Sequence, residues 1–233
     1  MNRNNPANSQ PEALARLKDE FDQDAYWIER HESYHGDPRS VGNLGRSVEE
    51  NLKGESRFNS AVTCAAADLK PYRTVLDIGC GYGRVASCFC DAGYDYTGVD
   101  VAPIAIEAAR RREPRGHFIL GSALEIGLEK KFDLICVLYV FVHFVDDSDW
   151  LALIRRLAGQ LTQGGSLLLA DHFSNIEQRP TKHVCQRPLS RYETVLKASG
   201  LSRDGDFNKR LASAWRLGGS PPPFELFRAQ SSF

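Results

Sequence analysis

Short apolar runs alternate with segments of helical spacing through the central part of the chain. The apolar runs predict strands at 73–78, 96–99, 117–120, 132–138 and 166–170. The segments between them predict helices at 84–91, 103–111 and 148–161. The run at 132–138 is typical of a strand that is covered on both faces. This order predicts an α/β fold with a doubly wound, parallel sheet.

Two further groups of elements flank this central part. Before it, helical spacing predicts helices at 11–30 and 48–69, separated by a polar loop at 31–46. After it, we expect a helix at 190–199 and strands at 201–207 and 224–228. Residues 1–10 are polar and are expected to be disordered. The chain is thus divided into a tail at 1–10, an N-terminal helical cap or lid at 11–70 and a core at 71–233.

The first strand ends in a glycine-rich turn, Val75-Leu-Asp-Ile-Gly-Cys-Gly-Tyr-Gly-Arg84. Glycine lets the backbone take positive φ and approach a ligand closely. A dinucleotide site requires Gly-x-Gly-x-x-Gly, but Arg84 stands at its third glycine. The carboxylate of Asp77 would also repel a pyrophosphate, whereas it suits an ammonium or sulfonium group. The turn therefore favours a cationic, amino-acid-like cofactor.

The pattern Asp77-x-Gly79-x-Gly81-x-Gly83 resembles the first motif of the class I S-adenosylmethionine-dependent methyltransferases. The resemblance covers about residues 70–172, including a Thr-Gln-Gly-Gly turn at 162–165, and extends more loosely to the C-terminus. It implies a doubly wound, seven-stranded, mostly parallel Rossmann-like sheet whose last strand is inserted antiparallel. It also implies S-adenosylmethionine as the cofactor and S-adenosylhomocysteine as the product.

Ligands of such sheets bind beyond the carboxyl ends of the strands. The glycine turn would meet the methionine and ribose parts of the cofactor, and Asp100 would accept hydrogen bonds from the ribose hydroxyls. A helix-capping role for Asp100 is the alternative. Ser122 stands where the family usually has an Asp for the adenine amino group, so its contact would be uncharged. The expected cofactor-binding residues are Asp77, Gly79, Cys80, Gly81, Gly83, Asp100, Val101, Ser122, Ala123 and Leu138.

Two histidines at the same sheet edge are candidate catalytic residues, His143 and His172. A base is needed only where the acceptor must lose a proton, and imidazole suits that task near neutral pH. A purely structural role for His143 remains open. The acids at 146, 147 and 149 could bind a metal, but they equally suit a helix N-terminus. Leu138 and Tyr139 stand where metal-dependent relatives have an acid, so no metal is expected.

The cap supplies candidate residues for the acceptor site. Tyr26 and Trp27 either form a lid or pack the first helix onto the sheet. Tyr34, His35 and Arg39 are the residues expected to define the acceptor, together with Tyr139 after the fourth strand. A closed lid would exclude water and shape the pocket.

The composition of the chain argues against nucleic acid and membranes as binding partners. The net charge of −1 among 233 residues gives no basic field for nucleic acid or an anionic membrane. No apolar run is long enough to span a bilayer, no signal peptide is evident, and six cysteines without Cys-x-x-Cys spacing indicate reduced thiols. We expect a cytoplasmic monomer or homodimer.

The sequence therefore predicts a methyltransferase acting on oxygen or nitrogen of a small molecule, such as a metabolite, natural product or glycan-like acceptor. The residues after the fourth strand lack the Asn/Asp-Pro-Pro-Tyr/Phe motif of enzymes that methylate adenine or glutamine amines. A nicotinamide-dependent oxidoreductase and a non-catalytic cofactor-binding protein of the same fold are the alternatives.

Overall fold

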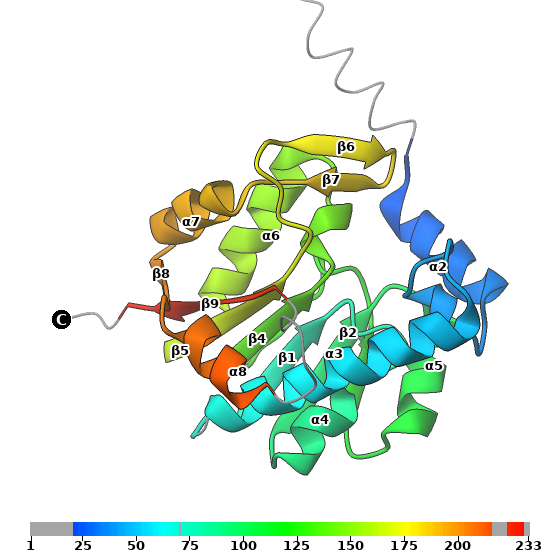
Figure 1. Ribbon diagram of the computed structural model, residues 1–233, viewed down its shortest axis with the longest axis horizontal. Coiled ribbons are helices and arrows are strands. Elements are labelled where there is room, and N and C mark those ends of the chain that lie inside the picture. Colours follow the sequence, from blue (N-terminus) through cyan, green and yellow to red (C-terminus); the bar gives the residue numbers. More distant parts are fainter. Residues whose placement is uncertain (1–20, 70, 216–222, 231–233) are drawn as a thin grey trace, which may run out of the picture.

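A computed structural model describes residues 21–69, 71–215 and 223–230. Its centre is a seven-stranded sheet with the order β3-β2-β1-β4-β5-β9-β8 (Figure 1). The strands are β1 Thr74–Ile78, β2 Asp95–Asp100, β3 His117–Leu120, β4 Phe132–Leu138, β5 Leu161–Ala170, β8 Leu201–Arg203 and β9 Phe224–Ala229. The first five are parallel, and β9 runs antiparallel between β5 and β8. The predicted mostly parallel sheet with an antiparallel last strand is confirmed.

Helices cover both faces of this sheet (Figure 1). One face packs against α3 Val48–Asp68, α4 Ala86–Asp91, α5 Pro103–Arg112 and α8 Phe207–Ala214. The other face packs against α6 Asp147–Gly159 and α7 Leu189–Ala198. Side chains along β4 point alternately to the two faces of the sheet. Because both faces are covered, all of them from Leu134 to Leu138 are apolar and buried.

Local sequence sets where these helices begin. Ser47 and Glu50 form a capping box at the start of α3, and Pro103 opens α5. At α6, the Asp146 carboxylate accepts hydrogen bonds from the amides of Ser148 and Asp149. The acids after Val145 therefore start a helix, as the alternative to metal binding proposed.

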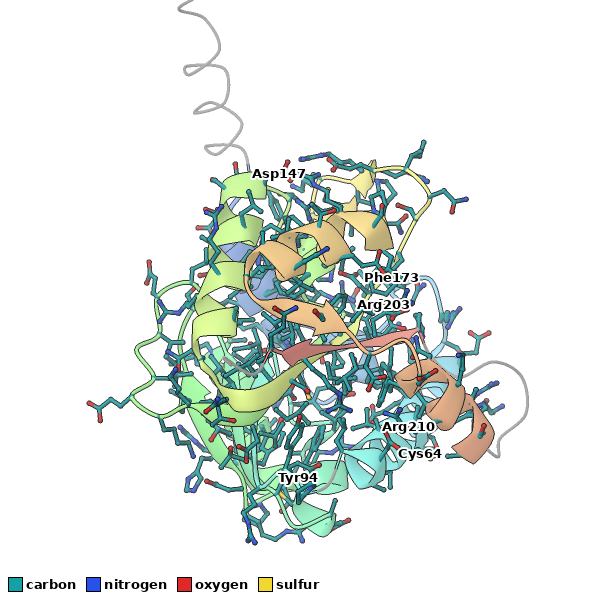
Figure 2. The ribbon with its side chains drawn as sticks, turned by 90° about the vertical axis from the view of Figure 1, so that its left-hand side faces the viewer. Cys64, Tyr94, Asp147, Phe173, Arg203 and Arg210 are labelled. Atoms are coloured by element: carbon teal, nitrogen blue, oxygen red, sulfur yellow. The ribbon has the colours of Figure 1, made fainter. Side chains whose placement is uncertain are left out.

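Two ion pairs link elements at the antiparallel edge of the sheet and beside it. Arg203 on β8 binds Glu225 on β9 with both ends of its guanidinium, at 2.7 and 2.8 Å. Arg210 on α8 binds Asp68 at the end of α3, at 3.0 Å. Figure 2 shows Arg210 directed from α8 toward the helix that carries Cys64. These contacts fix the antiparallel edge against the rest of the molecule.

The structure corrects several element boundaries. The first helix, α2, spans Gln23–Ser33 rather than continuing only to residue 30, and a 3-10 turn, η2 Pro38–Ser40, follows it. The tail at 1–10 and the start of the predicted first helix, at 11–20, lie outside the described residues. The 162–165 turn lies inside β5, where Gly164 has φ +75° and the register with β4 shifts.

Helix α8 and a β-hairpin were not predicted. The strand expected at 201–207 ends at Arg203, because the Asp204 carboxylate accepts the amides of Asp206 and Phe207 and starts α8. A separate hairpin is formed by β6 Gln178–Thr181 and β7 Val184–Gln186. All four residues of β6 are exposed, so the hairpin has no alternating apolar pattern that could reveal it. Within the described ranges, no helix has the length and apolar character needed to cross a membrane.

Candidate active site

A cavity of about 890 Å³ lies at the carboxyl ends of the central strands. The strand order reverses between β1 and β4, which is where open α/β sheets bind their ligands. The wall is formed from below by residues that follow five strands, namely Gly79, Cys80, Asp100, Val101, Gly121, Ala123, Leu138, Tyr139 and His172. Helix α2 and the segment after it close the cavity from above, with Asp24, Tyr26, Trp27, Arg30, His31, Val41 and Gly42.

The glycine turn after β1 is held by its own backbone, by the Val99 carbonyl of β2 and by Asp100. Gly79, Gly81 and Gly83 all have positive φ, between +52° and +74°. The amides of Gly79 and Cys80 donate to the Val99 carbonyl, at 2.8 and 3.0 Å, and the Gly83 amide donates to the Cys80 carbonyl. A Cβ at Gly79 would lie 2.5 Å from Val140. The turn is thus preorganised, and these amides are not available to cradle a pyrophosphate.

Asp100 ends β2 on the cavity wall. Its Oδ2 accepts a hydrogen bond from the Gly81 amide at 2.8 Å, and its Oδ1 accepts one from the Ala102 amide at 3.0 Å. Each carboxylate oxygen has a second lone pair, so Asp100 can still accept a hydrogen bond from a ligand hydroxyl. The alternative role, capping a helix, is not seen: α5 has Ala102 at its N-cap and receives no side-chain cap. The position of Asp100 on the wall is compatible with facing a ligand.

Asp77 lies beneath the glycine turn rather than on the cavity wall. It is 2% exposed and accepts a hydrogen bond from the Tyr96 hydroxyl at 2.6 Å. Burial raises the pKa of Asp77 to about 7. The expectation that this carboxylate faces the cofactor is therefore not met in the described structure, because its nearest partner is a tyrosine of the neighbouring strand. Among the described residues that line the cavity, Gly81, Gly83 and Ser122 are likewise absent, although their chain neighbours are present.

The two candidate catalytic histidines both line the cavity. His143 Nδ1 lies 2.9 Å from the main-chain carbonyl of His183, so we assign the ring proton to Nδ1 and the lone pair to Nε2. Burial lowers the pKa of His143 to about 4, which keeps the ring neutral near pH 7. Burial also lowers the pKa of His172, whose ring packs 4.9 Å from that of Tyr139. Either imidazole can accept a proton.

Tyr139 adopts an unusual backbone conformation at the end of β4. Its φ is +61°, the value of a left-handed residue, although it is not a glycine. A hydrogen bond from its amide to the Ala170 carbonyl, at 2.6 Å, holds the chain in place. Such strained positions gather at functional sites, and here the strain presents the ring of Tyr139 to the cavity.

The lid is held to the body by a histidine that sequence reasoning missed. His183 lies in the turn of the β6–β7 hairpin, and its Nε2 is 3.2 Å from the Tyr26 hydroxyl. The two rings stack with their centroids 4.5 Å apart, and Trp27 packs edge-on against His143 at 4.6 Å. A single histidine in a polar segment carries no pattern, so the sequence offered no signal for this contact. Tyr26 and Trp27 both line the cavity, as the lid interpretation expected.

The structure places the predicted acceptor residues of the cap elsewhere. Tyr34 and His35 line a second cavity of about 450 Å³, between the segment after α2 and the outer side of α5. Arg39 pairs with Asp37 at 2.6 Å and lies over the Tyr34 ring. The reason is helical spacing, since residues 23, 24, 27, 30 and 31 of α2 share the face toward the main cavity. The helix ends before Tyr34 can join that face.

The described residues contain no group of three or more His, Cys, Asp or Glu side chains that could hold a metal ion. Asp147, one of the candidate ligands, instead accepts hydrogen bonds from Arg187 and Arg191, at 2.8 and 2.5 Å. Asp171 accepts a hydrogen bond from Tyr192 at 2.6 Å. Burial raises the pKa of Asp171 to about 6. These acids are engaged in supporting the cavity from behind.

Comparison with known proteins points to one family. Residues 75–165 match the family model described as a methyltransferase domain. This segment is similar to that family. It contains the glycine turn, Asp100 and the strands β1 to β4 that form the lower wall of the cavity.

Curated relatives match over part of their length. Trans-aconitate 2-methyltransferase from Methylobacterium radiotolerans is 35% identical over 48% of this chain and 45% of its own length. 2-Methyl-6-phytyl-1,4-hydroquinone methyltransferase from Synechocystis is 22% identical over 77% of this chain and 57% of its own length. The chain thus spans about half the length of these relatives.

Solved structures share the fold over nearly their whole length. Magnesium protoporphyrin IX methyltransferase from Synechocystis has a TM-score of 0.65 at 18% identity, covering 90% of this chain and 98% of that one. A sugar N-methyltransferase from Streptoalloteichus has a TM-score of 0.62 at 16% identity, covering 81% and 95%. At these identities the likeness establishes the fold.

Proposed function

We propose that this protein transfers a methyl group from S-adenosylmethionine to an oxygen or nitrogen atom of a small-molecule acceptor. The observation that carries the proposal is the glycine turn with Asp100. The amides of its three glycines and of Cys80 are already bonded within the protein, and a carboxylate stands on the wall. This arrangement suits a ribose with free hydroxyls and disfavours a pyrophosphate. The names of the relatives, which include methyltransferases for an acid, a quinol and a sugar amine, support a small acceptor.

The cavity fits such a cofactor. Its volume of about 890 Å³ is in the range of small-molecule sites and leaves room for an acceptor. Asp100 would hold the ribose, and the close approach at Gly79 and Cys80 would admit the amino-acid part. When bound, S-adenosylmethionine supplies an electrophilic methyl group on a positively charged sulfur.

The chain's own residues would then position the acceptor and receive its proton. A neutral His143, with its proton fixed on Nδ1 by the His183 carbonyl, offers Nε2 to an acceptor hydroxyl or amine. His172 is a second candidate on the same wall. The aromatic side chains of α2 exclude water, and much of the rate enhancement would come from alignment of the acceptor. We expect the enzyme to act without a metal, in the cytoplasm, on a small molecule rather than on nucleic acid or at a membrane.

Calorimetry tests this proposal by comparing S-adenosylhomocysteine with NAD⁺. The wild-type protein is expected to bind S-adenosylhomocysteine and to ignore NAD⁺. Asp100→Ala should weaken that binding by about 10- to 100-fold, because hydrogen bonds to a charged partner are lost.

Asp95→Ala, at the exposed start of the same strand, is the matched control and should bind normally. Asp100→Asn separates charge from structure, since its side-chain oxygen can still accept the Gly81 amide. Preferential binding of NAD⁺, or undiminished affinity in both Asp100 variants, would contradict the proposal.

A further inference from the structure

Asp24 is a carboxylate on the cavity wall that comes from α2 rather than from the sheet. It lines the cavity together with Gly121 and Ala123, which follow β3. Ser122, Asp100 and Glu125 are all close enough to interact with it electrostatically. Asp24 therefore lies one strand beyond Asp100, at the end of the cavity formed by β2 and β3.

The fold does not need Asp24 as a helix cap. Asp22 already caps α2, with its Oδ1 accepting the Ala25 amide at 2.9 Å. Burial raises the pKa of Asp24 against the opposing effect of Ser122, and the neighbouring carboxylates raise it further. Its position thus disfavours the ionised form, and a hydrogen-bond donor from a ligand would offset that penalty.

The proposed cofactor carries such a donor. If Asp100 holds the ribose, the adenine ring extends toward the neighbouring strand β3. Adenine presents an exocyclic amino group, and a buried amino group needs an acceptor. The three residues directly after β3, Gly121, Ser122 and Ala123, supply no carboxylate, and Glu125 beyond them does not line the cavity. Asp24 supplies one to the same place from the opposite side of the cavity.

We propose that Asp24 recognises the adenine base by accepting a hydrogen bond from its exocyclic amino group. The assignment rests on the proposed function and extends it, because it makes α2 part of the cofactor site. The same helix carries Tyr26 and Trp27 on the adjoining part of the wall. Binding of the base would thereby hold the aromatic lid over the acceptor end of the cavity.

Affinity measurements with two ligands test the assignment. S-Inosylhomocysteine differs from S-adenosylhomocysteine in carrying a carbonyl oxygen where adenine has its amino group. The wild-type protein is expected to prefer the adenosyl ligand by about 10- to 100-fold, because the inosyl oxygen would face a carboxylate. Asp24→Asn, whose amide can also donate, should remove most of that preference. Asp24→Ala should weaken the adenosyl ligand and leave the inosyl ligand almost unchanged.

Asp22→Asn is the matched control, because it makes the same charge change on the same helix and Asn caps helices as well as Asp does. It should retain the wild-type preference. Binding of the inosyl ligand by the Asp24 variants shows that they are folded. If Asp24→Asn keeps the wild-type preference for the adenosyl ligand, the proposed role of Asp24 is wrong, while the proposed function still stands. Failure of the wild-type protein to bind S-adenosylhomocysteine overturns the proposed function with it.

Discussion

The Asp77 carboxyl group links the stability of the fold to pH. Its pKa is raised to about 7 by burial, whereas an unfolded aspartate titrates near ~3.9. The folded state therefore binds this proton more tightly. The stabilising contribution is complete below the unfolded pKa and is lost as the pH rises through the folded pKa near 7.

Replacing Asp77 by Asn should remove this loss. The Asn oxygen can still accept the Tyr96 hydroxyl, but no buried charge forms at high pH. We expect the free energy of unfolding to rise by about 1–3 kcal/mol at pH 8, and by much less at pH 5. Denaturant unfolding at the two pH values measures the difference.

Asp133 provides a contrast in the same sheet. Its carboxylate accepts the amides of Arg73 and Thr74, which help to lower its pKa. Asp133→Asn should therefore destabilise the protein at pH 8. A loss of stability at pH 8 in Asp77→Asn as well would show that the account of Asp77 is wrong.

Single residues also show what the sequence can predict. Gly79 and Asp100 were identified because a glycine turn and an acid at the next strand end form a recognisable spacing. Tyr96, His183 and Asp24 were not identified, because their roles depend on side chains that meet across elements. Asp77 is held beneath the turn by a hydrogen bond from Tyr96, and no rule of sequence spacing predicts that contact. The roles of His143 and His172 remain predictions.

At the level of elements, the cavity depends on the contact between α2 and the β6–β7 hairpin. His183 in the hairpin turn makes two contacts. Its ring contacts Tyr26 of α2, and its main-chain carbonyl contacts His143 after β4. The helix is otherwise anchored by Arg30, which donates to the Arg39 carbonyl at 2.9 Å. The hairpin thus couples the lid to a candidate base.

Removing the His183 ring should loosen α2. A hydrogen bond and a stacked ring pair are lost in His183→Ala, so amide exchange in residues 23–33 should become about tenfold faster. Hydrogen exchange measured by mass spectrometry resolves this segment from α6, which should not change. His117→Ala, on the exposed part of β3, is the control. Equal protection of α2 in His183→Ala and the wild type would refute the coupling.

Prediction of elements succeeded where burial imposed a pattern. The strands β1 to β4 and the helices α3 and α5 lie within a residue or two of their expected bounds. The strands have buried apolar side chains, and each of the two helices packs an apolar face against the sheet. The hairpin and α8 were missed. The residues of β6 are all exposed, and α8 begins where the Asp204 side chain interrupts an apparently continuous strand.

At the scale of the whole molecule, the sheet determines where chemistry can occur. Its order reverses between β1 and β4, so the loops after these strands separate and leave the cavity between them. The predicted fold class is confirmed, and the same architecture accounts for the family match over residues 75–165. The upper wall of the cavity could not be predicted, because α2 and the hairpin come to it from distant parts of the sequence (Figure 1).

A crystal structure with S-adenosylhomocysteine is the most direct test of the central claim that the glycine turn and Asp100 form the cofactor site. We expect the ribose hydroxyls within hydrogen-bonding distance of Asp100, the amino-acid part beside Gly79 and Cys80, and the sulfur directed toward the wall that carries Tyr139 and His172. A ligand bound in the second cavity near Tyr34, or in the main cavity with no contact to Asp100, would contradict the account.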